Sequence, residues 1–289
     1  MGKPKSILGI GRVLIDHVVV VPQYPVVDTK VLVDEHWRQI GGPVPVALST
    51  AAFYGIQTAF IGPVGEDENG QQIMDDLSAR KINMSHCKPT GVTGFAQIWT
   101  EQSTGKRTIA AYPGREITAD SVLKLDQAID DADIVHTDGS SSSVAVRAAN
   151  RKREQGGLVV LDAGSKKPGM EELLPHVDLL IASDLFCRSW FGREDVGAQE
   201  LMSLGCKSAV RTLGTEGAIY VDSEHELHEP AIDVTPVDTN GAGDIFCGAF
   251  LSGVARHWDP SRSLKFANFV AGYSCGFKSN TTLPNSEPT

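Results

Sequence analysis

The residues best suited to chemistry lie together in the motif DTNGAGD at residues 238–244, which runs into an apolar segment ending near Gly253. The apolar segment lacks proline and predicts a buried helix. The glycines of the motif permit backbone geometry that a side chain would block. We therefore expect the N–H groups of Gly241, Ala242 and Gly243 to point together at the helix N-terminus. The helix dipole favours an anion there, most simply a phosphate.

Asp244 occupies the first turn of the same predicted helix. Its carboxylate would repel a bound phosphate, so its presence needs a reason. The simplest is that Asp244 takes a proton from a hydroxyl group while that oxygen attacks phosphorus. The alternative is an acidic residue that merely complements the helix dipole, and it would suffice for an isolated Asp. The complete motif favours the chemical role.

The motif resembles the DTxGAGD signature of the ribokinase-like (PfkB) carbohydrate kinase family. The resemblance implies that Asp244 is the catalytic base and that the amides of Gly241, Ala242 and Gly243 form an anion hole. It also implies transfer of the γ-phosphoryl group of ATP to an alcohol, with Mg²⁺ bridging the phosphates. Three further stretches occur in the family's order: a GG turn at 41–42, a GxVGxDxxG-like stretch at 62–70 and a TLGxxG loop at 212–217.

The GG turn consists of Gly41 and Gly42, and a predicted helix follows it and ends before Gly55. Glycines permit close approach of the backbone to a ligand, and the prolines that follow suit a helix entrance. A plain tight turn explains the same residues equally well. The resemblance favours contact with the sugar, although Pro43 and Val46 stand where many family members have asparagines.

The TLGTEG stretch reads as a glycine turn between two strands. From sequence alone, a β-hairpin is an equally good explanation. The resemblance implies instead that Thr212, Gly214 and Gly217 line the phosphates and ribose of ATP. It also places Asn268, on a second apolar helix, against adenine. Ser183 joins this ATP-binding set because it opens the family's Asn-x-x-Glu stretch.

The expected sugar-binding residues are spread along the chain. The resemblance implies that Asp16 and Asp28 hold sugar hydroxyls. Asp138 ends a predicted strand at the carboxyl edge of the sheet, where ligands of α/β proteins collect, and matches an acidic substrate-contacting position of ketohexokinase-like members. Arg107 borders a predicted hairpin, and its planar guanidinium suits the transferred phosphoryl group. An exposed surface cation is the simpler explanation for Arg107 alone.

The expected metal ligands are acidic or amide side chains. The Asn-x-x-Glu motif that supports Mg²⁺ in many family members is altered here, with Ser183 and Phe186 at its two ends. Asp184 is the nearest acidic candidate for Mg²⁺. Asp238 and Asn240, with nearby main-chain carbonyls, are expected to hold a monovalent cation such as K⁺.

Two stretches, within about residues 12–40 and 92–113, predict antiparallel strands that project from a main sheet. From Asp133 onward strands and helices alternate, which is typical of a parallel sheet wrapped by helices. We therefore expect one ribokinase-like α/β domain over residues 1–289. It has three layers, a mostly parallel central sheet flanked by helices, and a small β-strand lid. The resemblance implies that this lid covers the sugar, where it would exclude water from the reaction, and that it forms a homodimer contact.

Composition narrows the possible partners. The formal net charge of −10 argues against nucleic acid and against an anionic membrane surface. No apolar run approaches the roughly 20 residues of a membrane span, and the first residues lack a secretory signal pattern. The five cysteines lack CxxC spacing, which indicates reduced thiols in a cytoplasmic protein.

A free sugar, either a ketose or a pentose, is the expected acceptor, since the Asp138 edge looks like that of ketohexokinase relatives. A nucleoside is the alternative, because DTNGAGD also occurs in adenosine kinase-like members. Phe95, Trp99 and Tyr112 would then supply a slot for the base. A hypothesis of another class is a sugar-binding sensor without turnover, and only the altered Asn-x-x-Glu motif supports it.

Overall fold

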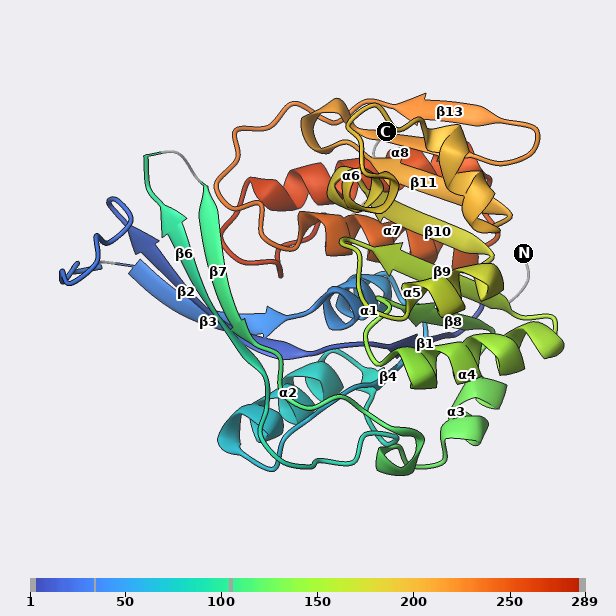
Figure 1. Ribbon diagram of the computed structural model, residues 1–289, viewed down its shortest axis with the longest axis horizontal. Coiled ribbons are helices and arrows are strands. Elements are labelled where there is room, and N and C mark those ends of the chain that lie inside the picture. Colours follow the sequence, from blue (N-terminus) through green and yellow to red (C-terminus); the bar gives the residue numbers. More distant parts are fainter. Residues whose placement is uncertain (1–3, 34, 104–105, 286–289) are drawn as a thin grey trace.

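A nine-stranded sheet forms the centre of the protein, whose computed structural model describes residues 4–33, 35–103 and 106–285 (Figure 1). Its strands run in the order β13-β12-β11-β10-β9-β8-β1-β4-β5. Neighbours from β11 to β5 are parallel, whereas β12 is antiparallel to both β11 and β13. The strands are β1 (Ile7–Ile10), β4 (Thr58–Ile61), β5 (Ile82–Asn83), β8 (Ile134–Thr137), β9 (Leu158–Ala163), β10 (Leu179–Ser183), β11 (Ser208–Thr212), β12 (Ala218–Val221) and β13 (Glu226–Glu229).

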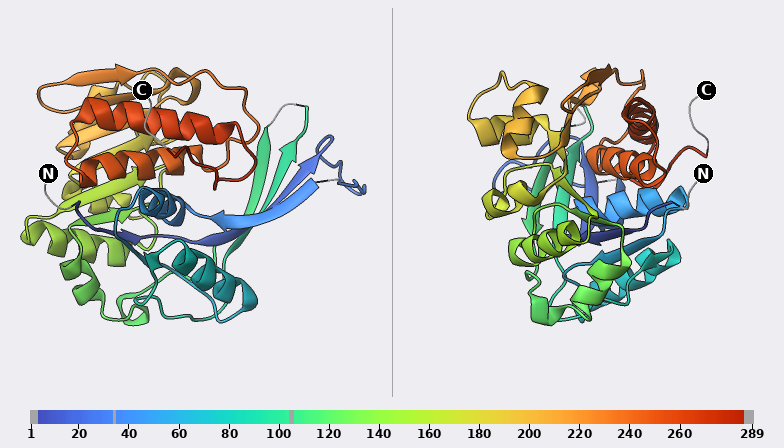
Figure 2. Two further views of the ribbon diagram at one scale, coloured as in Figure 1. Left: turned by 180° about the vertical axis from the view of Figure 1, so that it is seen from behind. Right: turned by 90° about the vertical axis from the view of Figure 1, so that its right-hand side faces the viewer.

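Helices cover both faces of this sheet (Figure 2). One layer contains α1 (Pro43–Phe53), α2 (Glu68–Ala79), α7 (Ala242–Ala255) and α8 (Pro260–Cys275). The other contains α3 (Leu125–Asp131), α4 (Ser142–Glu154), α5 (Met170–Leu173) and α6 (Asp184–Phe191). Short 3₁₀ turns are η1 (Ala119–Ser121), η2 (Leu174–His176), η3 (Ala198–Leu204) and η4 (Gly214–Glu216).

Burial along the strands follows from these two helical layers. Every residue of β1 and β8 is buried, and β9 is buried except at its first residue. A parallel sheet covered on both faces needs apolar side chains on both sides, which explains the continuous apolar runs in the sequence. The predicted three-layer α/β fold is confirmed.

Helices α1 and α7 pack closely against each other. A Cβ atom at Gly248 of α7 would overlap the carbonyl oxygen of Ala47 in α1, so glycine permits this approach. Phe246 and Phe250 of α7 belong to the same buried cluster as residues of α1 and α8. The helix predicted after DTNGAGD is therefore present, and it ends at Ala255.

A second, four-stranded sheet stands to one side of the central sheet (Figures 1 and 2), and we call it the small sheet. Its order is β3-β2-β6-β7, with β2 (Leu14–Val21), β3 (Glu35–Gly41), β6 (Phe95–Glu101) and β7 (Arg107–Tyr112). The predicted β6–β7 hairpin is present. The predicted antiparallel pairing of β2 with β3 is present as well. The two pairs join through β2 and β6, which are parallel, so the small sheet is mixed.

Within the described part of the chain, no helix combines the length and apolar character needed to cross a bilayer.

Candidate active site

A cavity of about 180 Å³ lies where the small sheet meets the first turns of α1 and α7. We call it the first cavity. It brings together residues that the sequence analysis took from separate stretches. Its lining comprises Leu14, Asp16, Gly41, Gly42, Pro43, Val46, Ala96, Ile98, Ile109, Ala111, Asn240, Gly241, Asp244 and Asn280. None of these side chains is cationic, so the polar part of the lining is acidic or amide.

Helix α7 begins at this cavity, with Gly241 as its N-cap at φ 80°. Glycine is favoured in this left-handed conformation. Within the described residues, the N–H groups of Gly241 and Gly243 have no acceptor, whereas Ala242 donates to the Thr239 carbonyl at 3.3 Å. Gly241 and Gly243 can therefore offer N–H groups to an anion, with Asp244 beside them in the first turn.

Asp244 lies in an acidic environment that strengthens it as a base. Burial raises the pKa of Asp244 well above its usual value, and the carboxylates of Asp162, Asp138 and Asp16 raise it further. The positive charge of Lys167 opposes this rise. A carboxylate with a raised pKa binds a proton more strongly, which suits proton abstraction from a hydroxyl.

Asp16, on β2, is held against the GG turn and is only 7% exposed. Burial raises the pKa of Asp16 to about 6, although hydrogen bonds from Asn240 and Gln39 oppose the shift. A Cβ atom at Gly41 would overlap the Asp16 carboxyl group, so glycine leaves room for it. The Asp16 oxygens at the cavity can accept hydrogen bonds from ligand hydroxyls.

Helix α1 also starts at the first cavity. Its N-cap, Gly42, has φ 104°, and a Cβ atom there would overlap the Arg12 carbonyl. The GG turn is therefore tightly fixed. Since α1 and α7 both begin here, the positive ends of two helix dipoles face the same space.

The other predicted sugar-binding residues lie outside the cavity lining. Arg107 of β7 donates from Nη1 to Thr239 Oγ1 at 3.1 Å and so reaches the DTNGAGD motif. Asp138 is wholly buried and pairs with Lys167 Nζ at 3.6 Å. Asp28 is exposed in the loop between β2 and β3, which extends from the outer end of the small sheet (Figure 1). Of these three, Arg107 alone contacts the motif.

The predicted ATP-binding residues gather at the turn between β11 and β12. Thr212 ends β11, and Gly214 and Gly217 both have positive φ in the turn that follows. A Cβ atom at Gly217 would overlap the Glu229 carbonyl, and Asn268 Nδ2 donates to that same oxygen at 2.8 Å. Gly217 and Asn268 therefore lie close together. The side-chain N–H of the buried Asn268 is already bonded to the main chain.

Asp184 and Ser183 have structural partners at the start of α6. Asp184 pairs through Oδ1 with Arg211 at 2.5 Å and through Oδ2 with Arg188 at 3.1 Å. Ser183 caps the helix by accepting the Phe186 N–H at 3.0 Å. Two arginines therefore already engage Asp184, and a Mg²⁺ ion would have to share its carboxylate oxygens with them.

Asp238 has an unused oxygen that fits a cation. Its Oδ1 accepts the N–H of Asn240 at 2.8 Å, while its buried Oδ2 has no partner among the described residues. A buried carboxylate oxygen without a partner is costly, and a bound cation would offset that cost. The described chain contains no cluster of three or more His, Cys, Asp or Glu side chains suited to a metal ion.

Sequence reasoning missed two residues of the site. Asn280 lines the cavity, packs against Gly241 and donates to the Ile40 carbonyl at 3.1 Å. No motif marks it. Lys167 follows β9 and donates to the Asp138 carbonyl at 2.5 Å. The sequence did contain an indication of this position, because a lysine that follows a buried strand lies at the carboxyl edge of the sheet, where ligands collect.

The aromatic residues considered for a nucleoside base lie on the other face of the small sheet. Ala96 and Ile98 line the cavity, so Phe95 and Trp99 of the same strand point away from it. Tyr112 alternates likewise on β7 and packs against Phe95, with ring centroids 5.9 Å apart. The structure does not support an aromatic slot inside this cavity.

The fold and the site are those expected of an α/β phosphotransferase, and known proteins resemble this chain along most of its length. The family description "pfkB family carbohydrate kinase" matches residues 4–287. Ribokinase of Bacillus subtilis is 25% identical over 97% of this chain and 96% of its own length. Fructoselysine 6-kinase of Escherichia coli is 29% identical over 78% of this chain and 83% of its own length.

Solved structures agree on the fold. Ribokinase of Arabidopsis thaliana, complexed with ribose and ATP, has a TM-score of 0.83 at 22% identity, covering 96% of this chain and 94% of its own. The chain belongs to the PfkB family of carbohydrate kinases. It is an ATP-dependent sugar kinase, a phosphotransferase with an alcohol group as acceptor.

Proposed function

We propose that this kinase phosphorylates one hydroxyl of a free sugar, a ketose or a pentose, with Asp244 as general base. The observation that carries the proposal is the first cavity, where Asp244, Asp16 and the GG turn meet between two helix N-termini. Its polar side chains suit uncharged hydroxyls. With no cationic side chain among the described lining residues, it supports a neutral sugar over a phosphorylated or sulfonated one.

The residues of the first cavity have different proposed roles in the reaction. Asp16, Asn240 and Asn280 hydrogen-bond the sugar hydroxyls and orient the ring. The Asp244 carboxylate accepts the proton of the attacking hydroxyl as its oxygen bonds to the γ-phosphorus of ATP, while the bond from that phosphorus to the bridging oxygen breaks and ADP leaves. The N–H groups of Gly241 and Gly243 hold the phosphate oxygens on which charge grows, and the dipoles of α1 and α7 add to this effect.

The proposed ATP site extends from this cavity to the turn between β11 and β12. Thr212, Gly214 and Gly217 would contact the phosphates and ribose, with Asn268 behind them. Bound Mg²⁺ would neutralise the phosphate charges. Because the oxygens of Asp184 are paired with arginines, we propose that the ion arrives with ATP and takes no ligand from that side chain.

A monovalent cation such as K⁺ is proposed at Asp238 and Asn240. The orphaned Asp238 Oδ2 supports it, as does the closeness of Asp238 to the N-terminus of α7. Held there, the cation would neutralise a carboxylate that otherwise repels phosphate. This role is electrostatic and needs no direct contact with the sugar.

A nucleoside kinase is the second candidate. Aminoimidazole riboside kinase of Salmonella typhimurium is 26% identical over 71% of this chain. Two observations weigh against a nucleoside here. The cavity volume is about 180 Å³, below the roughly 300 Å³ of the smallest common ligand pockets. The aromatic rings lie on the other face of the small sheet.

The proposal includes a single domain in which the small sheet acts as a lid, and a homodimer formed through that lid in the cytoplasm. Phe95 and Tyr112 support the dimer, since they are 42% and 46% exposed on the face away from the cavity. Exposed aromatic side chains that lie together are typical of protein interfaces.

A substrate panel tests the function. The purified protein is incubated with ATP, Mg²⁺ and K⁺ plus single ketoses, pentoses or nucleosides, and ADP formation is measured. We expect turnover with a free sugar and little with any nucleoside. Turnover confined to nucleosides would establish the second candidate. Sugar binding measured by calorimetry, without turnover on any acceptor, would establish a sugar-binding sensor that has no kinase activity. The Asp244→Asn variant serves as the control for a contaminating kinase.

A further inference from the structure

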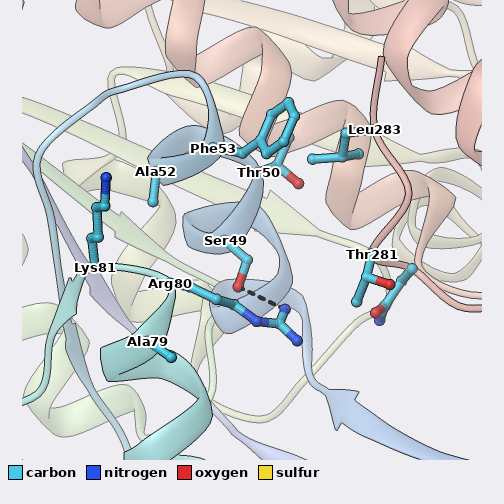
Figure 3. A pocket seen from close by; sticks show the side chains of 10 residues that line it. Ser49, Thr50, Ala52, Phe53, Ala79, Arg80, Lys81, Thr281 and Leu283 are labelled. Atoms are coloured by element: carbon cyan, nitrogen blue, oxygen red, sulfur yellow. Dashed lines mark hydrogen bonds between the residues drawn. The ribbon is translucent and has the colours of Figure 1, made fainter. Parts of the chain in front are cut away.

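A second and larger cavity, of about 350 Å³, lies between the C-terminal parts of α1 and α2 and the segment that follows α8 (Figure 3). We call it the second cavity. It is lined by Ser49, Thr50, Ala52, Phe53, Ala79, Arg80, Lys81, Asn280, Thr281 and Leu283. Its volume lies in the range of small-molecule sites, roughly 300–1,000 Å³. Nothing in the proposed kinase reaction uses these residues except Asn280.

Arg80 is the residue of the second cavity best suited to bind an anion. Its guanidinium is partly buried, and Nη1 donates to Ser49 Oγ at 3.2 Å (Figure 3). Within the described chain Arg80 forms no ion pair; burial lowers the pKa of Arg80, although the nearby Asp76 carboxylate opposes this fall. A partly desolvated guanidinium bonded only to a hydroxyl retains N–H groups for an oxyanion, which its planar fork binds in bidentate fashion.

The rest of the lining restricts the ligand further. Lys81 lies at the far rim with its side chain directed away from Arg80 (Figure 3), so it adds to the positive potential of the cavity without sharing a ligand atom with Arg80. A positive potential attracts a doubly charged phosphate monoester more strongly than a singly charged carboxylate. Phe53, 49% exposed, and Leu283 supply an apolar wall. An inorganic ion would leave that wall and most of the volume unused.

We propose that the second cavity binds a small phosphate monoester, with its phosphate on Arg80 and its organic part against Phe53 and Leu283. The site is separate from the proposed kinase reaction but touches it through Asn280, which lines both cavities and packs against Gly241. The Pro284 carbonyl accepts the Tyr54 hydroxyl at 3.0 Å, which ties the same segment to the end of α1. A bound ligand therefore holds the segment that carries Asn280.

Calorimetry with ribose 5-phosphate, orthophosphate and neutral ribose tests the site in the full chain. Arg80→Gln should weaken the binding of ribose 5-phosphate tenfold or more at one site. Lys265→Gln, which removes the same charge from an exposed position on α8, should leave it unchanged. Neutral ribose, which lacks the phosphate, reports the first cavity, so its affinity should be the same in wild type and Arg80→Gln.

A second variant guards against misfolding of Arg80→Gln. Ala79→Trp at an exposed lining position fills the cavity without removing a charge, and it should weaken the same binding. Orthophosphate that binds through Arg80 as tightly as ribose 5-phosphate identifies free phosphate as the ligand. Equal affinity of wild type, Arg80→Gln and Ala79→Trp for every probe overturns the proposal. Since the readout is binding, this result is independent of whether the sugar kinase proposal holds.

Discussion

Replacing Asp244 with Asn keeps the shape of the side chain and removes its ability to accept a proton. We expect kcat to fall by about 10²- to 10⁴-fold, the usual contribution of a general base. ATP should bind as well as before or slightly more tightly, since a negative charge near the phosphate site is lost. Steady-state kinetics and nucleotide calorimetry measure the two effects. A variant with near-normal kcat would exclude Asp244 as the base.

The pH dependence of the reaction should report the charges around Asp244. The base must be deprotonated, so kcat/KM falls as the pH drops through the pKa of Asp244. Lys167 holds that pKa down. Lys167→Met should therefore raise the pKa of Asp244 and move the acid limb of the kcat/KM profile to higher pH.

Lys166→Met is the matched control for this pH shift. The Lys166 ammonium pairs with Glu171 at 3.5 Å and lies 4.7 Å from the centre of the Trp190 ring, so it has partners of its own. Its loss should leave the acid limb in place. An unchanged limb in Lys167→Met, or a shift to lower pH, would contradict the electrostatic account.

Single residues were predictable where a motif fixes them and not elsewhere. DTNGAGD predicted that Gly241 and Asp244 lie at one helix N-terminus, because glycine geometry and a carboxylate in one turn admit few explanations, and the structure has them there. Asn280 escaped because its contact with Gly241 depends on how the chain returns after α8. The arginine partners of Asp184 also depend on tertiary contacts, so the sequence alone could not reveal that two cations already engage its carboxylate.

At the level of elements, the GG turn fixes how α1 meets the first cavity, and an alanine should disturb it. Gly42→Ala combines an unfavourable positive φ with overlap between Cβ and the Arg12 carbonyl. Gly55→Ala, at φ 80° after the end of α1, meets no atom within 4 Å. We expect Gly55→Ala to cost about 1–2 kcal/mol of unfolding free energy from backbone strain alone.

Gly42→Ala should cost more than Gly55→Ala and also raise the KM for the sugar, because the turn must shift to relieve the overlap. Urea unfolding compares the stabilities of the two variants, and kinetics compares their KM values. Equal losses of stability in both, with normal KM values, would show that the overlap at residue 42 does not constrain the site.

Elements were easier to predict from the sequence than their pairing. Buried strands, α7 and the β6–β7 hairpin follow from apolar runs and turn residues. The parallel pairing of β2 with β6 does not, because alternation along a strand fixes which residues share a face and leaves the partner strand open. Alternation also leaves open which face of β6 meets the cavity. Phe95 and Trp99 were the residues considered for that face, but the structure places Ala96 and Ile98 there.

At the scale of the whole molecule, several side-chain contacts join the small sheet to the rest of the protein, and two of them can be removed without changing the lining of the first cavity. Arg107 of β7 donates to Thr239 Oγ1, and Glu35 of β3 pairs with Lys278 Nζ at 2.6 Å. Both lie at the surface, so each adds little to the unfolding free energy. Their expected role is to hold the small sheet over the first cavity, where it keeps water from the phosphoryl group.

Arg107→Ala should therefore loosen the coupling between ATP use and sugar phosphorylation. We expect a severalfold higher KM for the sugar and an ADP yield that exceeds the sugar phosphate yield, with both products measured in one reaction. Lys278→Ala removes the ion pair with Glu35 and should uncouple in the same direction. Arg147→Ala, which breaks an exposed pair with Asp126 on α3, should not. If Arg107→Ala lowers kcat while ADP and sugar phosphate still form in equal amounts, its guanidinium acts on the phosphoryl group and not as a closure contact.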